Sequence, residues 1–302
     1  MNKIKNIAIV GGTHGNEYTG AYLIRQLAQN SFQEQWAELN IELIMANPQA
    51  YKKGLRFIDY DLNRSFTKAA LADFSLSGYE ANRAKALMQK LGSKENPKMD
   101  FIMDMHTTTS NMGITVILAD NNDYNFKLAA YIQTQIPECY IYYMPAESTM
   151  HSTEHSFLIA MAPLGLAIEI GAIPNGIIRH DINKKTQQVI DITLDFIDQT
   201  NKGGSPKINN QVTVFKHKKV VDYPIDSAGE INAIIHQDLQ DRDYQKLTKG
   251  EAIFSTIEDQ TITYNEDEDL YPVFINEAAY YYKKTAFSLT EKMIVDVEKG
   301  MV

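Results

Sequence analysis

Short apolar segments alternate with amphipathic segments along residues 5–198 of this 302-residue chain. The apolar segments predict strands at residues 5–10, 39–46, 100–105, 114–119, 140–144 and 164–170. Apolar residues at helical spacing predict helices at residues 18–29, 79–91, 124–135 and 185–198. Because strands and helices alternate in this way, we expect an α/β fold, with a mostly parallel or mixed sheet flanked by helices on both faces.

This pattern ends at residues 201–206, a polar segment that contains Gly203, Gly204 and Pro206. Beyond it, β-branched and aromatic residues lie between turn signals and predict strands at residues 212–221, 230–236, 252–257 and 261–264. We therefore expect a domain boundary here, with an α/β domain over residues 1–203 and a smaller β-rich domain over residues 204–302.

The composition excludes several classes of protein. The chain carries 29 Lys and Arg against 38 Asp and Glu, and this net charge of −9 argues against a partner that is a nucleic acid. Residues 1–10 hold no apolar run typical of a signal peptide, and no window approaches the ~18 apolar residues of a membrane span, so we expect a cytoplasmic protein. Cys139 is the only cysteine, so any metal must be held by histidine and carboxylate.

Two histidines and a glutamate follow predicted strands, where ligands gather in α/β proteins. His14 and Glu17 lie between the first strand and the first helix, and their His-x-x-Glu spacing can direct both side chains at one metal ion. His106 ends the third strand and would complete a His, Glu, His set, as catalytic zinc uses. Asp104 could orient an imidazole or could face away from it, because residues i and i+2 share a face only if the strand continues that far. The alternatives are an ordinary strand-to-helix turn and a packed or surface histidine.

Glu169 is the single carboxylate in an otherwise apolar predicted strand. An ionised carboxylate is costly to bury without a partner, so burial would raise its pKa towards the working pH, as a general base requires. The alternative is a glutamate at a strand end that faces solvent.

Two further segments carry side chains suited to a substrate. Arg56 and Arg64 flank a polar segment, and their guanidinium groups suit the capture of a carboxylate or an oxyanion. Surface ion pairs of Arg56 with Asp59 or Asp61 would also explain this segment. Residues 271–284 are aromatic and basic, and one or more of their tyrosines could close over a site. The remaining histidines show no spacing typical of ligands: His151, His155, His180, His217 and His236.

Five blocks of sequence carry a resemblance to a known family: residues 12–17, 61–64, 104–113, 168–171 and 276–281. They read Gly-Thr-His-Gly-Asn-Glu, Asp-Leu-Asn-Arg, Asp-Met-His-Thr-Thr-Thr-Ser-Asn-Met-Gly, Ile-Glu-Ile-Gly and Asn-Glu-Ala-Ala-Tyr-Tyr. In this order the blocks resemble the aspartoacylase family, a branch of the zinc carboxypeptidase fold. The resemblance implies an α/β catalytic domain whose site is capped by a β-rich C-terminal domain.

The resemblance also implies a role for each residue that matches the family's motifs. His14, Glu17 and His106 fall on the zinc ligands, so one zinc ion per chain is expected. Glu169 falls on the glutamate that activates water, and Arg56 matches the arginine that steadies the developing oxyanion.

Four more positions match residues that contact the substrate in this family. Asn63 and Arg64 match the pair that binds the substrate's carboxylate. Tyr280 and Lys284 match contacts that the capping domain makes with the substrate.

The implied activity is hydrolysis of the amide bond of a small N-acyl amino acid, first of all N-acetyl-L-aspartate to acetate and L-aspartate. One departure from the family concerns the binding of the substrate's side chain. Aspartate-specific enzymes bind the side-chain carboxylate of the substrate with an arginine, whereas residues 151–168 here contain no arginine and Ile159 occupies that place. The alternatives are an aminoacylase for neutral or aromatic N-acyl amino acids, a zinc carboxypeptidase and a non-catalytic zinc-binding protein. The resemblance further implies a homodimer or a higher homo-oligomer.

Overall fold

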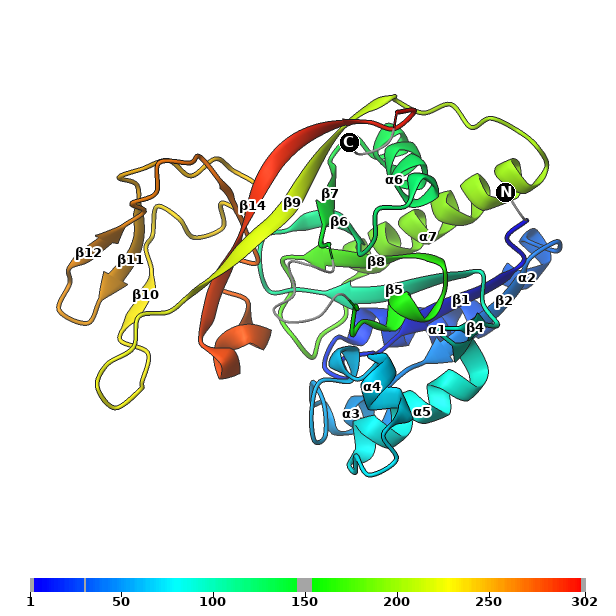
Figure 1. The fold of residues 1–302 in the computed structure, drawn as a ribbon, viewed down its shortest axis with the longest axis horizontal. Coiled ribbons are helices and arrows are strands. Elements are labelled where there is room, and N and C mark those ends of the chain that lie inside the picture. The colour runs from blue at the N-terminus through cyan, green and yellow to red at the C-terminus, as the bar shows by residue number, and fades with distance from the viewer. Residues whose placement is uncertain (1–2, 30, 146–153, 300–302) are drawn as a thin grey trace.

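A computed structural model describes residues 3–29, 31–145 and 154–299, so His151 lies outside the described residues (Figure 1). Its central mixed sheet contains β1 (Asn6–Gly11), β2 (Asn40–Met45), β5 (Phe101–Thr107), β6 (Gly113–Leu118), β7 (Cys139–Tyr143), β8 (Leu164–Gly171), β9 (Gln211–Asp222), β13 (Tyr271–Val273) and β14 (Thr285–Asp296). The spatial order of these strands is β13-β14-β9-β7-β6-β8-β5-β1-β2. The expected α/β fold is confirmed.

Helices cover both faces of this sheet. One face packs against α1 (Tyr18–Gln29), α6 (Asp123–Gln135) and α7 (His180–Asn201). The other face packs against α4 (Lys68–Ala72), α5 (Tyr79–Leu91) and the short helix η3 (Leu158–Met161). Along β1, Ile7 and Ile9 join the first core while Ala8 and Val10 join the second. Because both faces are buried, β1 is apolar at each position from Ile7 to Gly11 rather than at alternate positions.

Short elements fill the connections between these layers. They are α2 (Phe32–Gln35), α3 (Pro48–Lys53), η1 (Leu62–Arg64), η4 (Ala278–Lys283) and the small β3 (Gly92–Ser93) and β4 (Asn96–Pro97) pair. Among the described residues, no helix combines the length and the apolar character that crossing a membrane would require.

The strand register places three segments at one edge of the sheet. β1, β5 and β8 are parallel neighbours, so their carboxyl ends meet at the same edge. Within this set His106 of β5 lies directly beside Glu169 of β8. β6 runs antiparallel to β8, and β14 runs antiparallel to β9 and β13, which makes the sheet mixed. The carboxyl edge therefore gathers the loop after β1, His106 and Glu169.

The C-terminal segment extends the central sheet and also builds a core of its own. β9 pairs with β7, and β14 pairs with β9 along its length, so two long strands run side by side away from the sheet (Figure 1). At the outer end lies a separate sheet of β10 (Ala233–Ile235), β11 (Ala252–Thr256) and β12 (Thr261–Thr263). Its core includes Phe254 and Phe287. The boundary between residues 203 and 204 stays a prediction.

The sequence analysis assigned no strand beyond residue 264, whereas the structure has β13 and β14 there; the short β3 and β4 pair was also not predicted. In β14, residues 286–290 are all buried, and alternation between buried and exposed positions begins only after them. Only a short stretch of β14 therefore shows the two-residue alternation that identifies a half-buried strand.

Gly11 allows α1 to pack closely on β1. A Cβ atom at this position would lie 2.3 Å from the carbonyl oxygen of Gly20 in α1. We expect Gly11→Ala to lower the free energy of unfolding by about 3 kcal/mol, because backbone must move to relieve the overlap. Chemical denaturation checks this, with Gly204→Ala in an exposed segment as the control, where the nearest atom lies at 3.0 Å. An equal decrease in the free energy of unfolding in both variants would contradict the close-packing argument.

Candidate active site

The loop between β1 and α1 carries two of the predicted ligands. It turns at Gly12, whose φ of 67° favours glycine, and the amide of Glu17 then donates to the carbonyl of His14 at 3.2 Å. The side chains meet beyond this turn, with Nδ1 of His14 at 2.6 Å from Oε1 of Glu17. The three-residue spacing thus directs both side chains to one point.

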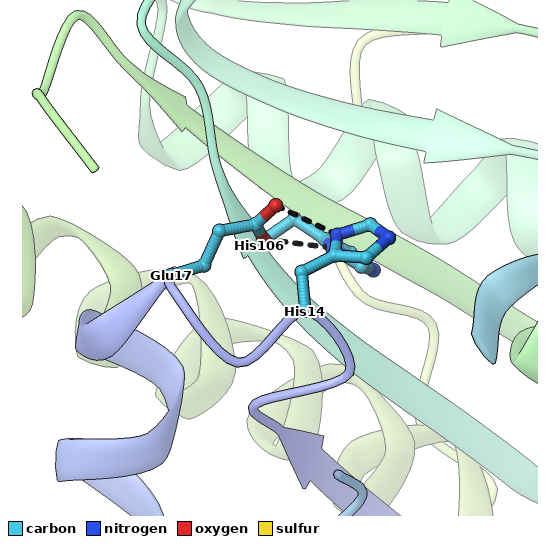
Figure 2. Close-up of side chains that lie close together, drawn as sticks. All are labelled: His14, Glu17 and His106. Atoms are coloured by element: carbon cyan, nitrogen blue, oxygen red, sulfur yellow. Dashed lines mark hydrogen bonds and ion pairs between the residues drawn. The ribbon is translucent and has the colours of Figure 1, made fainter. Parts of the chain in front are cut away.

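His106 reaches the same point from β5 (Figure 2). Its Nδ1 lies 3.1 Å from Nδ1 of His14 and 3.0 Å from Oε2 of Glu17. All three residues are buried, and their candidate ligand atoms lie within 4.8 Å of one another. The structure therefore brings the predicted His, Glu, His set together.

A carboxylate lies behind each imidazole. Nε2 of His106 is 2.8 Å from Oδ2 of Asp104, and Nε2 of His14 is 3.0 Å from Oδ1 of Asp61. An ionised carboxylate only accepts hydrogen bonds, so each Nε2 donates to the carboxylate behind it, and each Nδ1 faces the shared point. The contact of Asp104 is one of the two alternatives left open by the sequence, whereas Asp61 had been considered as a surface partner of Arg56.

The donor set at this point fits a divalent metal. Burial opposes ionisation of Glu17, but His14 and His106 outweigh it and lower the pKa of this carboxyl below its ordinary value. Two imidazole nitrogens and a carboxylate therefore face one another in a buried space, and a divalent cation can bind there once the imidazoles have released the Nδ1 protons that face Glu17. Two histidines and one glutamate are the protein ligands of many catalytic zinc sites.

Arg56 is held against the ligand set by two carboxylates. Its guanidinium group donates to Oε1 of Glu17 at 3.0 Å and to Oδ2 of Asp61 at 3.2 Å. The exposed fraction of its side chain is 15%, against 5% for each carboxylate. The surface ion pair considered from sequence is therefore wrong, because this pair is buried beside the candidate ligands.

The segment that carries Arg56 and Asp61 is anchored by Glu80 of α5. This glutamate is fully buried, and it accepts hydrogen bonds from the backbone amides of Ile58 at 2.7 Å and Asp59 at 2.9 Å. Sequence reasoning missed Glu80 because a glutamate in the first turn of a helix is ordinary. Its contacts lie about twenty residues away and leave no local signal.

Glu169 lies beside His106 and is 8% exposed, so the alternative of a solvent-facing glutamate is wrong. Its Oε1 is buried and has no hydrogen-bond partner among the described residues. Burial raises the pKa of this carboxyl well above its ordinary value, and the charges of Glu17 and Glu277 act in the same direction. Glu169 is therefore close to the ligand set and holds a proton more readily than an exposed glutamate.

A cavity of about 70 Å³ opens beside the ligand set, between the sheet edge and the C-terminal segment. Three of the predicted substrate contacts line it: Asn63, Arg64 and Tyr280. Ile159 is also part of the wall. Of the three consecutive tyrosines only Tyr280 faces the cavity, since Tyr281 and Tyr282 are exposed.

Lys284 is not brought to this cavity with the other predicted residues. It is absent from the cavity lining, and its ammonium group donates to the carbonyl of Gly229 in the C-terminal segment. The sequence placed it by resemblance alone, and its position after η4 turns the side chain to a neighbouring loop.

Glu277 connects the C-terminal segment to the loop after β5 and was missed by the sequence analysis. Its carboxylate accepts from the backbone amide of Thr109 at 2.8 Å, from the hydroxyl of Thr108 and from the amide of Ala279 at 2.9 Å. These bonds hold η4, and with it Tyr280, beside the strand that carries the second histidine. The only sequence signal was its place in the block of residues 276–281.

The fold and the site together define a class: a mixed α/β protein with a candidate metal centre at the carboxyl ends of β1 and β5, covered by a β-rich C-terminal segment. The chain belongs to the succinylglutamate desuccinylase/aspartoacylase family. The catalytic domain of that family matches residues 3–197. Its AstE/AspA barrel-sandwich hybrid domain matches residues 210–292.

Whole-chain comparisons agree with this assignment. A protein of Trichodesmium erythraeum named "Probable aspartoacylase" is 45% identical, and the match covers 98% of this chain and 100% of the relative. The N-acyl-aromatic-L-amino acid amidohydrolase (carboxylate-forming) of Xenopus tropicalis is 37% identical over 96% of this chain and 93% of its own. The crystal structure of murine aminoacylase 3 superposes with a TM-score of 0.91 at 33% identity, over 98% of both chains.

The carboxylate behind His106 provides a test of the metal centre. We expect Asp104→Asn to weaken zinc binding by about 10- to 100-fold, because the amide no longer fixes the imidazole with its lone pair towards the metal. Competition with a chromophoric chelator measures this affinity directly. Asp181→Asn, at an exposed position, is the control. An unchanged zinc affinity in Asp104→Asn would rule out this role.

Proposed function

We propose that this protein hydrolyses the amide bond of small N-acyl amino acids, with one zinc ion per chain at His14, Glu17 and His106. The convergence of these three buried side chains beside the unpartnered oxygen of Glu169 carries the proposal. The relatives named aspartoacylase and N-acyl-aromatic-amino acid amidohydrolase support it. A homo-oligomer and a cytoplasmic location stay predictions.

The reaction needs an activated water, and Glu169 is the base that this chain offers. A zinc ion at the three ligands would polarise the amide carbonyl and make water more acidic. Oε1 of Glu169 accepts the proton of the attacking water, because its raised pKa brings it closer to neutral pH. The same oxygen then returns the proton to the leaving nitrogen. Arg56 provides a fixed positive charge for the oxyanion.

Three residues of the cavity wall bind the substrate's α-carboxylate in this proposal. Arg64 lies with its guanidinium carbon 5.0 Å from the ring of Phe157 and offers a planar pair of donors. Oδ1 of Asn63 accepts from a backbone amide of η3 at 2.8 Å, which leaves its NH2 group to donate to the substrate. Burial raises the pKa of Tyr280, so its hydroxyl stays a donor. The amide thus arrives in a fixed orientation.

The wall of the cavity favours a neutral side chain on the substrate. Ile159 is 6% exposed and presents an apolar surface where an aspartate-specific relative would present arginine. Lys284 is bonded to Gly229 and away from the cavity. We therefore propose neutral N-acyl amino acids as the preferred substrates, and N-acetyl-L-aspartate is the competing candidate.

The other two alternatives receive less support. A zinc carboxypeptidase would use the same ligands and base but must admit a peptide, whereas Tyr280 and Glu277 of the C-terminal segment form part of the cavity wall beside the ligands. A protein that only binds zinc has no need of a buried carboxyl group beside the ligands, and burying Glu169 is costly.

Removal of the proposed base tests the mechanism. We expect Glu169→Gln to reduce kcat for N-acetyl-L-alanine by about 10²–10⁴-fold while zinc content stays near one per chain, because the amide cannot take up a proton. Amine release and metal analysis on the same sample measure both quantities. Glu38→Gln, an exposed position, is the control. Turnover within a few-fold of the parent would show that another group is the base.

The position of Ile159 tests the substrate preference. We expect Ile159→Arg to raise the ratio of kcat/KM for N-acetyl-L-aspartate over N-acetyl-L-alanine by about 10-fold or more, because a guanidinium group then faces the side-chain carboxylate. Ile159→Met keeps the size without the charge and should leave the ratio near that of the parent. If the parent already prefers N-acetyl-L-aspartate strongly, the proposed neutral preference is wrong.

A further inference from the structure

Two turns of the C-terminal segment meet the loop after β5 at one buried carboxyl group, that of Asp243. This residue is 5% exposed. Its Oδ1 accepts a hydrogen bond from the amide of Ile275 at 3.1 Å, and the backbone of Asn111 in the loop after β5 also faces the carboxyl. The side-chain amide of Asn111 donates to the carbonyl of Asp241 at 2.9 Å, which ties the same loop to the first turn. Oδ2 of Asp243 is buried and has no hydrogen-bond partner among the described residues.

Both turns hold backbone conformations that their residues rarely adopt. In the first turn, Asp241 and Tyr244 have φ angles of 64° and 62°. In the second turn, Phe274 and Asn276 have φ angles of 55° and 59°, on either side of Ile275. Left-handed residues other than glycine persist where surrounding contacts fix them. Asp243 thus joins two turns whose conformations depend on contacts outside themselves.

The second turn carries part of the wall of the cavity beside the ligand set. Phe274 and Glu277 line this cavity, and so does Tyr280 of η4. The amide that donates to Asp243 belongs to the residue between Phe274 and Asn276, directly before this block. Movement of the turn would therefore displace three side chains that the substrate meets in the proposed reaction.

We propose that Asp243 is a positioning residue for the substrate: its neutral form holds residues 274–280 against the loop after β5, and its ionisation loosens this contact and weakens substrate binding. This role rests on the proposed deacylase function and makes substrate binding depend on pH. Asp243 is not among the residues that line the cavity, so it acts through the turn of Ile275 rather than by touching the substrate.

The ionised form of Asp243 is costly at this position. Burial raises the pKa of its carboxyl to about 7, and the charge of Asp241 acts in the same direction. The backbone groups of Ile275 and Asn111 lower this pKa, but they do not outweigh burial. Above that pH the group is a buried carboxylate with one oxygen unpartnered, and contact with water relieves the cost. Water reaches the carboxylate when the two turns separate.

The other charged or titratable groups around Asp243 do not compensate its charge. Arg242 of the same turn donates to Glu251 at 3.0 Å, and Glu277 accepts from the loop after β5. Burial raises the pKa of Tyr244 well above its ordinary value, so its hydroxyl stays neutral. In the part of the chain that the structure describes, no cation forms an ion pair with Asp243. Ionisation therefore adds an uncompensated charge to the junction.

The test measures KM and kcat for N-acetyl-L-alanine with the full zinc-loaded chain between about pH 6 and about pH 9. We expect KM of the parent to rise by about 10-fold as the pH passes about 7, because each unit by which substrate binding shifts the pKa of Asp243 changes KM tenfold. Asp243→Asn keeps the size and stays neutral, so its KM should remain near the low-pH value of the parent. Asp259→Asn, at an exposed residue with a φ of 60° between β11 and β12, is the control and should follow the parent.

Asp241→Asn provides a graded test that leaves the buried carboxyl in place. Asparagine tolerates the left-handed conformation of this residue, and loss of the neighbouring charge lowers the pKa of Asp243. The rise in KM should therefore begin at a lower pH than in the parent. A purely structural role would instead shift KM of Asp243→Asn equally at every pH and leave the profile of Asp241→Asn unchanged.

Hydrogen–deuterium exchange of residues 274–280 gives a readout that does not depend on catalysis. After correction for the intrinsic effect of pH on exchange, protection in the parent should fall as the pH passes about 7 and should stay constant in Asp243→Asn. If Asp243→Asn does not fold, the shift of both profiles in Asp241→Asn decides the question.

The outcomes separate this inference from the proposed function. If the parent hydrolyses the amide but its KM and the protection of residues 274–280 do not change with pH, the role of Asp243 is wrong and the deacylase function stands. The same holds if both quantities change equally in the parent and in Asp243→Asn. If the parent hydrolyses no N-acyl amino acid, the proposed function falls, and the effect on substrate binding falls with it.

Discussion

The candidate active site depends on the mutual neutralisation of buried charges. Three carboxylates, two imidazoles and one guanidinium group meet at the carboxyl edge of the sheet, and each is bonded to at least one of the others. Because burying an unpaired charge costs free energy, moving any one of these six groups would leave its neighbours unpaired and destabilise the site. The loop after β1, the segment of Arg56 and Asp61, and the end of β5 are therefore fixed relative to one another. Glu80 extends this constraint into α5 through backbone amides.

Glu277 is the charged residue through which the C-terminal segment bonds to the loop after β5, beside the backbone contacts of Ile275 and Ala278. Glu277 takes hydrogen bonds from the loop after β5 and from the start of η4, so Tyr280 is positioned by the same strand that carries His106. β9 and β14 complete the arrangement because they continue the central sheet through β7. The cover over the cavity is thus built on the sheet rather than attached by a free linker, which keeps the carboxylate-binding groups at a constant distance from the ligands.

The sequence predicted those parts of the site that depend on short spacing or on strand ends. The spacing of His14 and Glu17, the strand-end position of His106 and the apolar surroundings of Glu169 drew attention to these residues, and the resemblance to the family gave them their roles. The register of β5 and β8 places His106 beside Glu169 in the structure. Asp61 and Glu277 escaped this reasoning because their partners lie 47 and 168 residues away, respectively. Lys284 was placed by resemblance alone, and its ammonium group bonds to the carbonyl of Gly229 rather than lining the cavity. β14 was missed because its first half is buried on both faces and lacks alternation.

The candidate ligands and the walls of the cavity beside them come from different parts of this fold. All three candidate ligands and Glu169 lie at the ends of central strands, where the register and the charge network leave little freedom. The wall of the cavity beside them includes Ile159 of η3 and Tyr280 of η4, which make no ion pair of this network. Relatives of similar overall identity can therefore carry different substrate names, as the aspartoacylase and N-acyl-aromatic-amino acid amidohydrolase matches do. Overall identity is consequently a weak guide to the substrate in this fold, and the residues of these walls are the informative ones.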